Sequence, residues 1–164
     1  MTSVAAAVLG AEPFLRGMPE AQLKTLAGLC QHVCIPAGDR LFEEGTMASQ
    51  FWIIDAGRVR LDASVPGRIP VTIEMLGRND VVGLSWMQPP YQWRFGATAV
   101  QPLQAYAFDA RAVRAACDAD PVLGYELSRR FFAAAVHRLQ ATRARLLEAH
   151  AQSGIISARG ESGE

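Results

Sequence analysis

Residues 51–61 read FWIIDAGRVRL, two apolar runs on either side of the pair Ala56-Gly57. The runs are rich in aromatic and β-branched side chains, which is typical of β-strands. Glycine readily adopts the positive φ of a tight turn, so Ala56-Gly57 predicts a hairpin turn. The stretch therefore predicts two consecutive strands joined by a very short connection.

Outward from this turn, residues 32–109 repeat the pattern of short apolar runs separated by turn residues. The turn residues recur at intervals of about ten, the rhythm of an antiparallel barrel or sandwich. Gly77-Arg78-Asn79-Asp80 is one such turn, and Asn79 is the residue best suited after glycine to a left-handed backbone. The sequence predicts strands at residues 32–36, 40–42, 50–55, 58–63, 71–76, 80–82, 95–100 and 104–108.

Helical periodicity flanks this β region on both sides. Apolar residues recur with a period of 3.6 in residues 19–30, which predicts a helix there. A short helix is expected at about residues 110–117, followed by a long one that runs toward residue 150. The pair Asp120-Pro121 is a strong start signal for the long helix, with aspartate as N-cap and proline in the first turn.

The chain of 164 residues, 50% hydrophobic and 20% charged, fits one globular domain of ordinary size. We expect a flexible N-terminus at residues 1–12, the domain at residues 13–150 and a disordered tail at residues 151–164. Within the domain, the barrel is expected at about residues 32–109 and the C-terminal helices at about residues 110–150.

Charge and cysteine content narrow the class of protein. Sixteen Lys+Arg balance sixteen Asp+Glu, so the chain lacks the positive field of a bulk polyanion binder. The apolar run at residues 4–9 is far too short for a membrane span. Cys30, Cys34 and Cys117 are an odd number and contain no C-x-x-C, which argues against a disulfide framework and a zinc site. We expect a soluble cytoplasmic protein that does not contact a membrane.

Three glycine-containing blocks, residues 38–45, 51–61 and 76–83, follow one another in an order that resembles the cyclic-nucleotide-binding domain of catabolite-activator and Fnr-type regulators. The resemblance covers roughly residues 14–147. It implies a mainly β fold with flanking helices (α+β), a β-jelly-roll or double-stranded β-helix barrel with an N-terminal helix and a long C-terminal helix.

In that family a phosphate-binding cassette offers backbone N–H groups of a short helix, an arginine and a glutamate to the ligand. The resemblance places this cassette at residues 83–98, where Gly83 matches but Leu84 stands in place of the glutamate. Leucine cannot accept a hydrogen bond from a ribose hydroxyl. The candidate ligand-binding residues are Gly83, Leu84, Ser85, Trp86, Arg94, Ala97 and Thr98.

The residues of the cassette leave several interpretations open. Arg94 is either an anion ligand or a surface arginine, because the small residues expected directly after it are displaced. Trp86 and Trp93 are either core side chains under the cassette or a stacking platform for a planar ligand. Ser85 is either a phosphate donor or a cap of the short helix.

The long helix carries a seam at coiled-coil spacing, with steps of four, three, four and three residues. Related regulators dimerise along this helix, so the resemblance implies a homodimer. The alternative is that the same stripe packs only on the protein's own barrel. The seam consists of Phe132, Val136, Leu139, Arg143 and Leu146.

No enzymatic activity is expected. His32, His137 and His150 are scattered rather than clustered as a cupin metal site requires, and no G-x-S-x-G elbow is present. Three cysteines are also too few for an iron–sulfur cluster of four thiolates. We expect no metal and no firmly assigned cofactor, with cyclic AMP or cyclic GMP as candidate ligands.

Two functions of different class follow. The first is a regulatory sensor that binds a cyclic nucleotide or another anion in the cassette and signals through the long helix to an unidentified effector protein. The second is a ligand-independent dimeric interaction module whose pocket is filled. Residues 151–164 are too few for a helix-turn-helix, which disfavours direct DNA binding.

Overall fold

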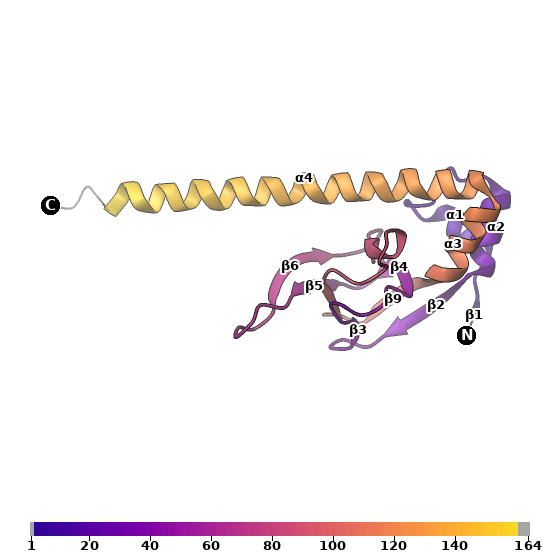
Figure 1. Cartoon of the computed structure of the whole chain (residues 1–164), viewed down its shortest axis with the longest axis horizontal. Helices are drawn as coiled ribbons and strands as arrows, with labels where there is room; N and C mark the ends of the chain where they lie inside the picture. The colour runs from indigo at the N-terminus through magenta and orange to yellow at the C-terminus, as the bar shows by residue number, and fades with distance from the viewer. Residues whose placement is uncertain (1, 161–164) are drawn as a thin grey trace. The chain divides into compact units, whose positions relative to one another are not determined.

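Two antiparallel sheets form the body of the protein in the computed structural model, which describes the backbone of residues 2–160 and the side chains of residues 4–152 (Figure 1). One sheet has the order β1 (Thr2–Ser3), β2 (Cys30–Ile35), β9 (Leu103–Asp109), β4 (Gln50–Ala56) and β7 (Val81–Val82). The other has the order β3 (Arg40–Phe42), β8 (Gly96–Ala99), β5 (Val59–Ala63) and β6 (Val71–Leu76). The helices are α1 (Ala6–Ala11), α2 (Glu20–Gly28), the single-turn η1 (Leu84–Met87), α3 (Ala110–Ala119) and α4 (Pro121–Gly160).

The predicted jelly roll is therefore present, with strand bounds that differ by a residue or two from those expected. The bounds of β3 and β6 coincide with the prediction. Asn79 has a φ of 70°, the left-handed turn expected of it. Local side-chain patterns set these features, because each depends only on residues close in sequence.

The connection at Ala56-Gly57 corrects one detail of the prediction. Gly57 has the expected positive φ of 95°, and a Cβ there would lie 2.3 Å from the carbonyl oxygen of Pro102. However, β4 and β5 do not pair with each other. Strand β4 already lies between β9 and β7, so it has no free edge, and the chain passes at Gly57 into the second sheet.

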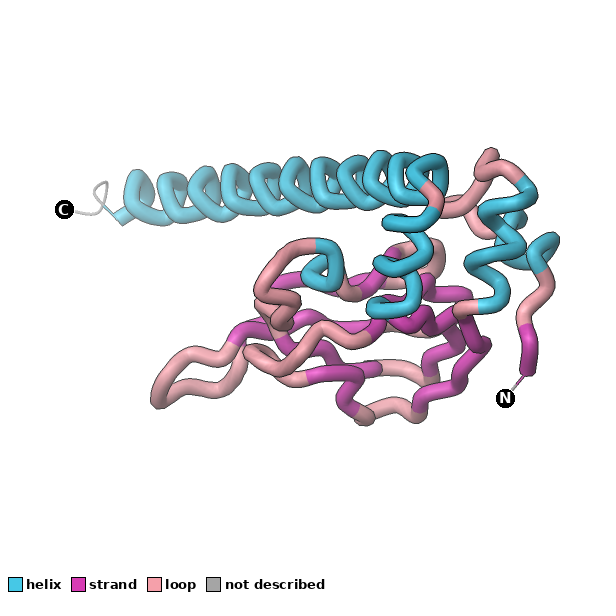
Figure 2. The backbone as a smooth tube through the Cα atoms, turned by 45° about the vertical axis from the view of Figure 1, so that its right-hand side comes forward, coloured by secondary structure: helices cyan, strands magenta, loops and turns pink. Residues whose placement is uncertain are grey.

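The two faces of the first sheet are covered differently. Phe51 and Phe108 are paired across β4 and β9 and are fully buried, with stacked rings. Trp52 alternates with Phe51 and therefore points to the opposite face, between the sheets. Figure 2 shows the short helices α2 and α3 at the ends of sheet strands, and α3 contacts both β4 and β9.

The start of the chain differs from the expected flexible segment at residues 1–12. Strand β1 pairs with β2, and α1 buries Leu9 completely. An alanine-rich stretch carries little amphipathic pattern, so its packing could not be seen in the sequence.

The chain divides into two compact units, residues 1–130 and residues 131–164. Helix α4 begins in the first unit at Pro121, as expected, because the Asp120 carboxylate accepts from the backbone N–H groups of Val122 (3.0 Å) and Leu123 (3.4 Å). It continues to Gly160, into the stretch expected to be a tail, and residues 161–164 lie outside the described residues.

Candidate ligand-binding cassette

The cassette begins where β7 ends. Gly83 has a φ of 97°, and η1 follows directly with Leu84, Ser85 and Trp86. A Cβ at Gly83 would lie 2.8 Å from Cη2 of Trp93, closer than real Cβ contacts allow. Glycine is therefore required here both for the left-handed backbone and for the approach of an indole ring.

Trp93 fills the space beside Gly83. Only 4% of its surface is exposed, and its ring stacks on Phe42 with centroids 3.8 Å apart and planes inclined by 14°. The Trp93 backbone is held on both sides, because its N–H donates to the Thr46 carbonyl and its own carbonyl accepts from the Gly45 N–H, both at 2.9 Å. Of the two interpretations of Trp93, its geometry corresponds to core packing.

Trp86 packs on the other side of the first sheet. Its ring stacks on Phe51 at 4.6 Å, and Phe51 stacks in turn on Phe108 at 4.6 Å. Because 99% of Trp86 is buried, this ring offers no accessible face to a planar ligand. Both tryptophans of the cassette therefore belong to the core.

The remaining predicted residues do not converge on one point. Arg94 is exposed, and no hydrogen bond or ion pair is described for its side chain. Ala97 and Thr98 lie on β8, where they are buried and paired with β5. Ser85 makes no side-chain cap to η1, and its carbonyl accepts from the Gln88 N–H at 3.4 Å. Only Gly83, Leu84, Ser85 and Trp86 share a single turn.

Arg40 forms a polar cluster that the sequence did not reveal. Its guanidinium donates to both carboxylate oxygens of Asp62 (2.6 and 2.9 Å), to the Thr98 hydroxyl (2.8 Å) and to both oxygens of Glu43 (3.0 and 2.8 Å). Hydrogen bonds to these carboxylates raise the pKa of Arg40 further above its ordinary value. Asp62 is 99% buried, so the cluster joins β3, β5 and β8 through a paired charge.

Arg114 connects the cassette to α3. Its Nη1 donates to the Trp86 carbonyl at 2.7 Å, and its guanidinium carbon lies 4.2 Å from the centre of the Tyr91 ring. These contacts join residues from distant parts of the sequence, which no local pattern could indicate. Beside them is a cavity of about 330 Å³. It is lined by Trp86, Met87, Tyr91, Arg114, Cys117, Asp118, Gly124, Leu127 and Ser128.

Among the side chains that the structure describes, those of residues 4–152, no three His, Cys, Asp or Glu residues gather as a metal site would require. Burial raises the pKa of the Cys30 thiol to about 11 and also raises that of Cys117. None of the helices in the described part of the chain combines the length and the hydropathy of a transmembrane helix.

Solved structures share this fold. A protein named as a cyclic nucleotide-binding protein from Geobacter metallireducens superposes with a TM-score of 0.76 at 23% identity, covering 83% of this chain and 98% of the other. A cyclic nucleotide-binding domain from Methylobacillus flagellatus gives a TM-score of 0.72 at 19% identity, covering 80% and 74%. The catabolite activator protein of Thermus thermophilus gives 0.61 at 21% identity, covering 88% and 63%.

A search of curated proteins found no match. The sequence profile of the cyclic nucleotide-binding domain matches residues 32–120, more than half of the chain. This range contains the jelly-roll strands from β3 to β9, the cassette and α3. The protein therefore belongs to the cyclic nucleotide-binding domain family.

Proposed function

We propose that this protein is a regulatory interaction module whose cassette is filled by its own aromatic side chains and which works without a cyclic nucleotide. Membership of the family supports a regulatory role. The observation that carries the proposal is the position of Trp93, stacked on Phe42 and in contact with Gly83. A ligand that approached the Gly83 backbone would meet this indole.

The polar groups of the cassette support the same proposal. Leu84 cannot accept a hydrogen bond from a sugar, and residues 83–98 contain one arginine and no acidic residue. That arginine, Arg94, is exposed rather than directed by any described hydrogen bond. Recognition of a sugar phosphate needs several convergent donors and acceptors. The proposed role is therefore binding of a protein partner rather than of a nucleotide, and no catalytic activity is proposed.

The proposed output runs through α3 and α4. Arg114 joins α3 to the cassette, and α3 is followed directly by α4. Phe132, Leu139 and Leu146 expose 71%, 50% and 57% of their surface, which is unusual for large apolar side chains and suits a helix that pairs with a second copy. We propose a homodimer through this seam, which presents the module to an effector protein.

A second candidate is a sensor that binds cyclic AMP, cyclic GMP or another anion in the cassette. The observation that favours it is Gly83, whose left-handed backbone and following single-turn helix are retained. In this candidate the ligand displaces Trp93 and the change reaches α3 through the contact between Arg114 and the Trp86 carbonyl. In this candidate, binding of the ligand and displacement of the Trp93 side chain are one coupled equilibrium.

Calorimetry and thermal-shift measurements distinguish the two candidates. Cyclic AMP, cyclic GMP and cyclic di-GMP would each be titrated into the full chain up to millimolar concentration. The filled-cassette proposal expects neither binding heat nor a change in melting temperature. Heat from any of the three, abolished by Arg94→Ala but retained in the exposed-surface control Arg111→Ala, would overturn it in favour of the sensor.

A further inference from the structure

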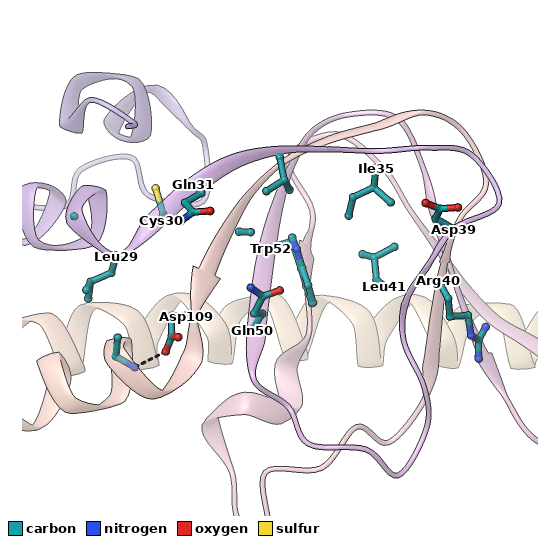
Figure 3. Close-up of a pocket in the computed structure, with 14 residues that line it drawn as sticks. Leu29, Cys30, Gln31, Ile35, Asp39, Arg40, Leu41, Gln50, Trp52 and Asp109 are labelled. Atoms are coloured by element: carbon teal, nitrogen blue, oxygen red, sulfur yellow. Dashed lines mark hydrogen bonds between the residues drawn. The ribbon is translucent and has the colours of Figure 1, made fainter. Parts of the chain in front are cut away.

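A cavity of about 530 Å³ lies between the two sheets and includes neither Gly83 nor Arg94 (Figure 3). One wall consists of alternate residues from three neighbouring strands: Gln31, Val33 and Ile35 on β2, Gln50 and Trp52 on β4, and Ala107 and Asp109 on β9. Alternate residues of a strand share one face, so this wall is a single continuous surface. Asp39, Arg40 and Leu41 form the opposite wall.

The apolar part of the cavity lies beside Trp52, a core side chain that is 5% exposed. Figure 3 shows Trp52 in the middle, with Ile35 and Leu41 on one side of its ring and Gln50 and Asp109 on the other. Ile35 and Leu41 are only half-buried, so the apolar wall is open to an occupant. The volume falls within the range of about 300–1,000 Å³ that is typical of small-molecule sites.

The charges that line the cavity disfavour an anion. All five N–H groups of Arg40 already donate, to Asp62, Glu43 and Thr98, so its guanidinium has no donor left for a ligand. Asp39 adds a carboxylate for whose side chain no hydrogen bond or ion pair is described. Asp109 adds a second, of which only Oδ1 is engaged, by the Ala112 N–H at 2.7 Å.

Two amides complete the polar lining. Gln31 and Gln50 are exposed, and no side-chain hydrogen bond is described for either. A glutamine amide both donates and accepts, so the pair suits a neutral hydrogen-bonding group as well as a cation. The cavity therefore combines an apolar wall, two amides and two carboxylates.

We propose that this cavity is a ligand site for a small molecule that is neutral or cationic, packed against the half-buried Ile35 and Leu41 beside the buried Trp52 and hydrogen-bonded by Gln31 and Gln50. An aromatic series joins it to the cassette, because Trp52 stacks on Phe42 at 5.7 Å and Phe42 stacks on Trp93 at 3.8 Å. The site does not depend on the proposed nucleotide-independent function, which calorimetry with nucleotides tests separately.

The test uses three single-ring probes that differ in charge: benzamidine (cation), nicotinamide (neutral) and benzoate (anion). Each is titrated into the full chain labelled with nitrogen-15, and the indole N–H signals are followed by NMR. Benzamidine and nicotinamide are expected to shift the Trp52 signal, with benzoate binding at least about threefold more weakly than benzamidine. Absence of any shift, equal binding of benzoate, or shifts centred on the Trp86 signal instead would overturn the proposal.

Matched variants locate the site. Asp39→Asn is expected to weaken benzamidine about threefold and leave nicotinamide unchanged, whereas Asp118→Asn, also exposed but outside the cavity, changes neither. Gln31→Phe is expected to abolish both interactions by covering the cavity, while Gln104→Phe, an exposed glutamine on β9 outside the lining, leaves both intact. If a cavity variant and its control changed probe binding equally in either pair, the probes would bind outside this cavity and the proposal would be overturned.

Discussion

The contact between Gly83 and Trp93 makes a prediction at the scale of single residues. Gly83→Ala would add a Cβ at 2.8 Å from the indole and a side chain at positive φ, so we expect the free energy of unfolding to fall by about 3 kcal/mol. Gly67 also has a positive φ, of 73°, but lies in open space, so Gly67→Ala should remove only about 1–2 kcal/mol. Urea denaturation measures both.

A second background separates the two contributions. In a Trp93→Leu protein the clash with the indole is relieved and only the Gln50 carbonyl oxygen remains close, at 3.3 Å, so the additional effect of Gly83→Ala should fall toward that of Gly67→Ala. If Gly83→Ala remains as destabilising in this background, the indole is not in contact with Gly83 in solution.

The three cysteines should differ in reactivity. Cys34 is exposed, Cys117 is half-buried, and Cys30 is buried with a pKa raised to about 11, so its reactive thiolate is scarce at neutral pH. We expect iodoacetamide to label Cys34 first and Cys30 last, as followed by peptide mass spectrometry. In denaturant the three rates should converge, whereas early labelling of Cys30 in the folded protein would contradict its burial.

At the scale of elements, the first turn of α4 should be sensitive to pH. Gln22 donates to the Asp120 carboxylate at 2.8 Å and, together with the backbone N–H groups of Leu123 and Val122, lowers the pKa of Asp120 below its ordinary value of 3.8. Because the pKa of Asp120 is lower in the folded than in the unfolded state, its carboxylate stabilises the fold at pH values above the ordinary pKa. This contribution is lost as the pH falls through the folded-state pKa. Asp120→Asn should therefore lower the melting temperature at pH 7 and have less effect in acid.

The exposed aspartate Asp118 provides the control for that measurement, since no hydrogen bond of its side chain is described. Asp118→Asn should leave the melting curve nearly unchanged across the same pH range. A difference between wild type and Asp120→Asn that stays constant from neutral to acid pH would show that the carboxylate charge does not contribute.

The seam of α4 can be tested independently of any ligand. Leu139→Glu places a charge at its centre and should shift the protein from dimer to monomer in sedimentation analysis. Ala144→Glu is the control, because Ala144 is exposed and lies about 100° around the helix from the seam position Arg143. Equal masses for wild type and both variants would contradict the proposed dimer.

At the scale of the whole molecule, the sequence predicted what depends on neighbouring residues. Strands, the Asn79 turn and the Asp120 cap each follow from a short local pattern, and the glycine blocks indicated the family. The sequence could not show that β5 joins the other sheet, because that depends on which edges of β4 are already paired. It also could not place the Trp93 ring on Phe42 or the Arg114 contact with Trp86, which join distant segments.

Under the proposed filled cassette, the buried indole of Trp93 also limits the affinity of any ligand that enters the cassette. A ligand at Gly83 must first drive a tryptophan out of its packed position, and loss of a buried tryptophan from a core costs about 3 kcal/mol or more. This cost reduces the binding free energy of the entering ligand and raises the dissociation constant of that ligand by about a hundredfold. The Trp93 side chain therefore acts as an intramolecular competitor, whose local concentration at the site does not depend on the protein concentration.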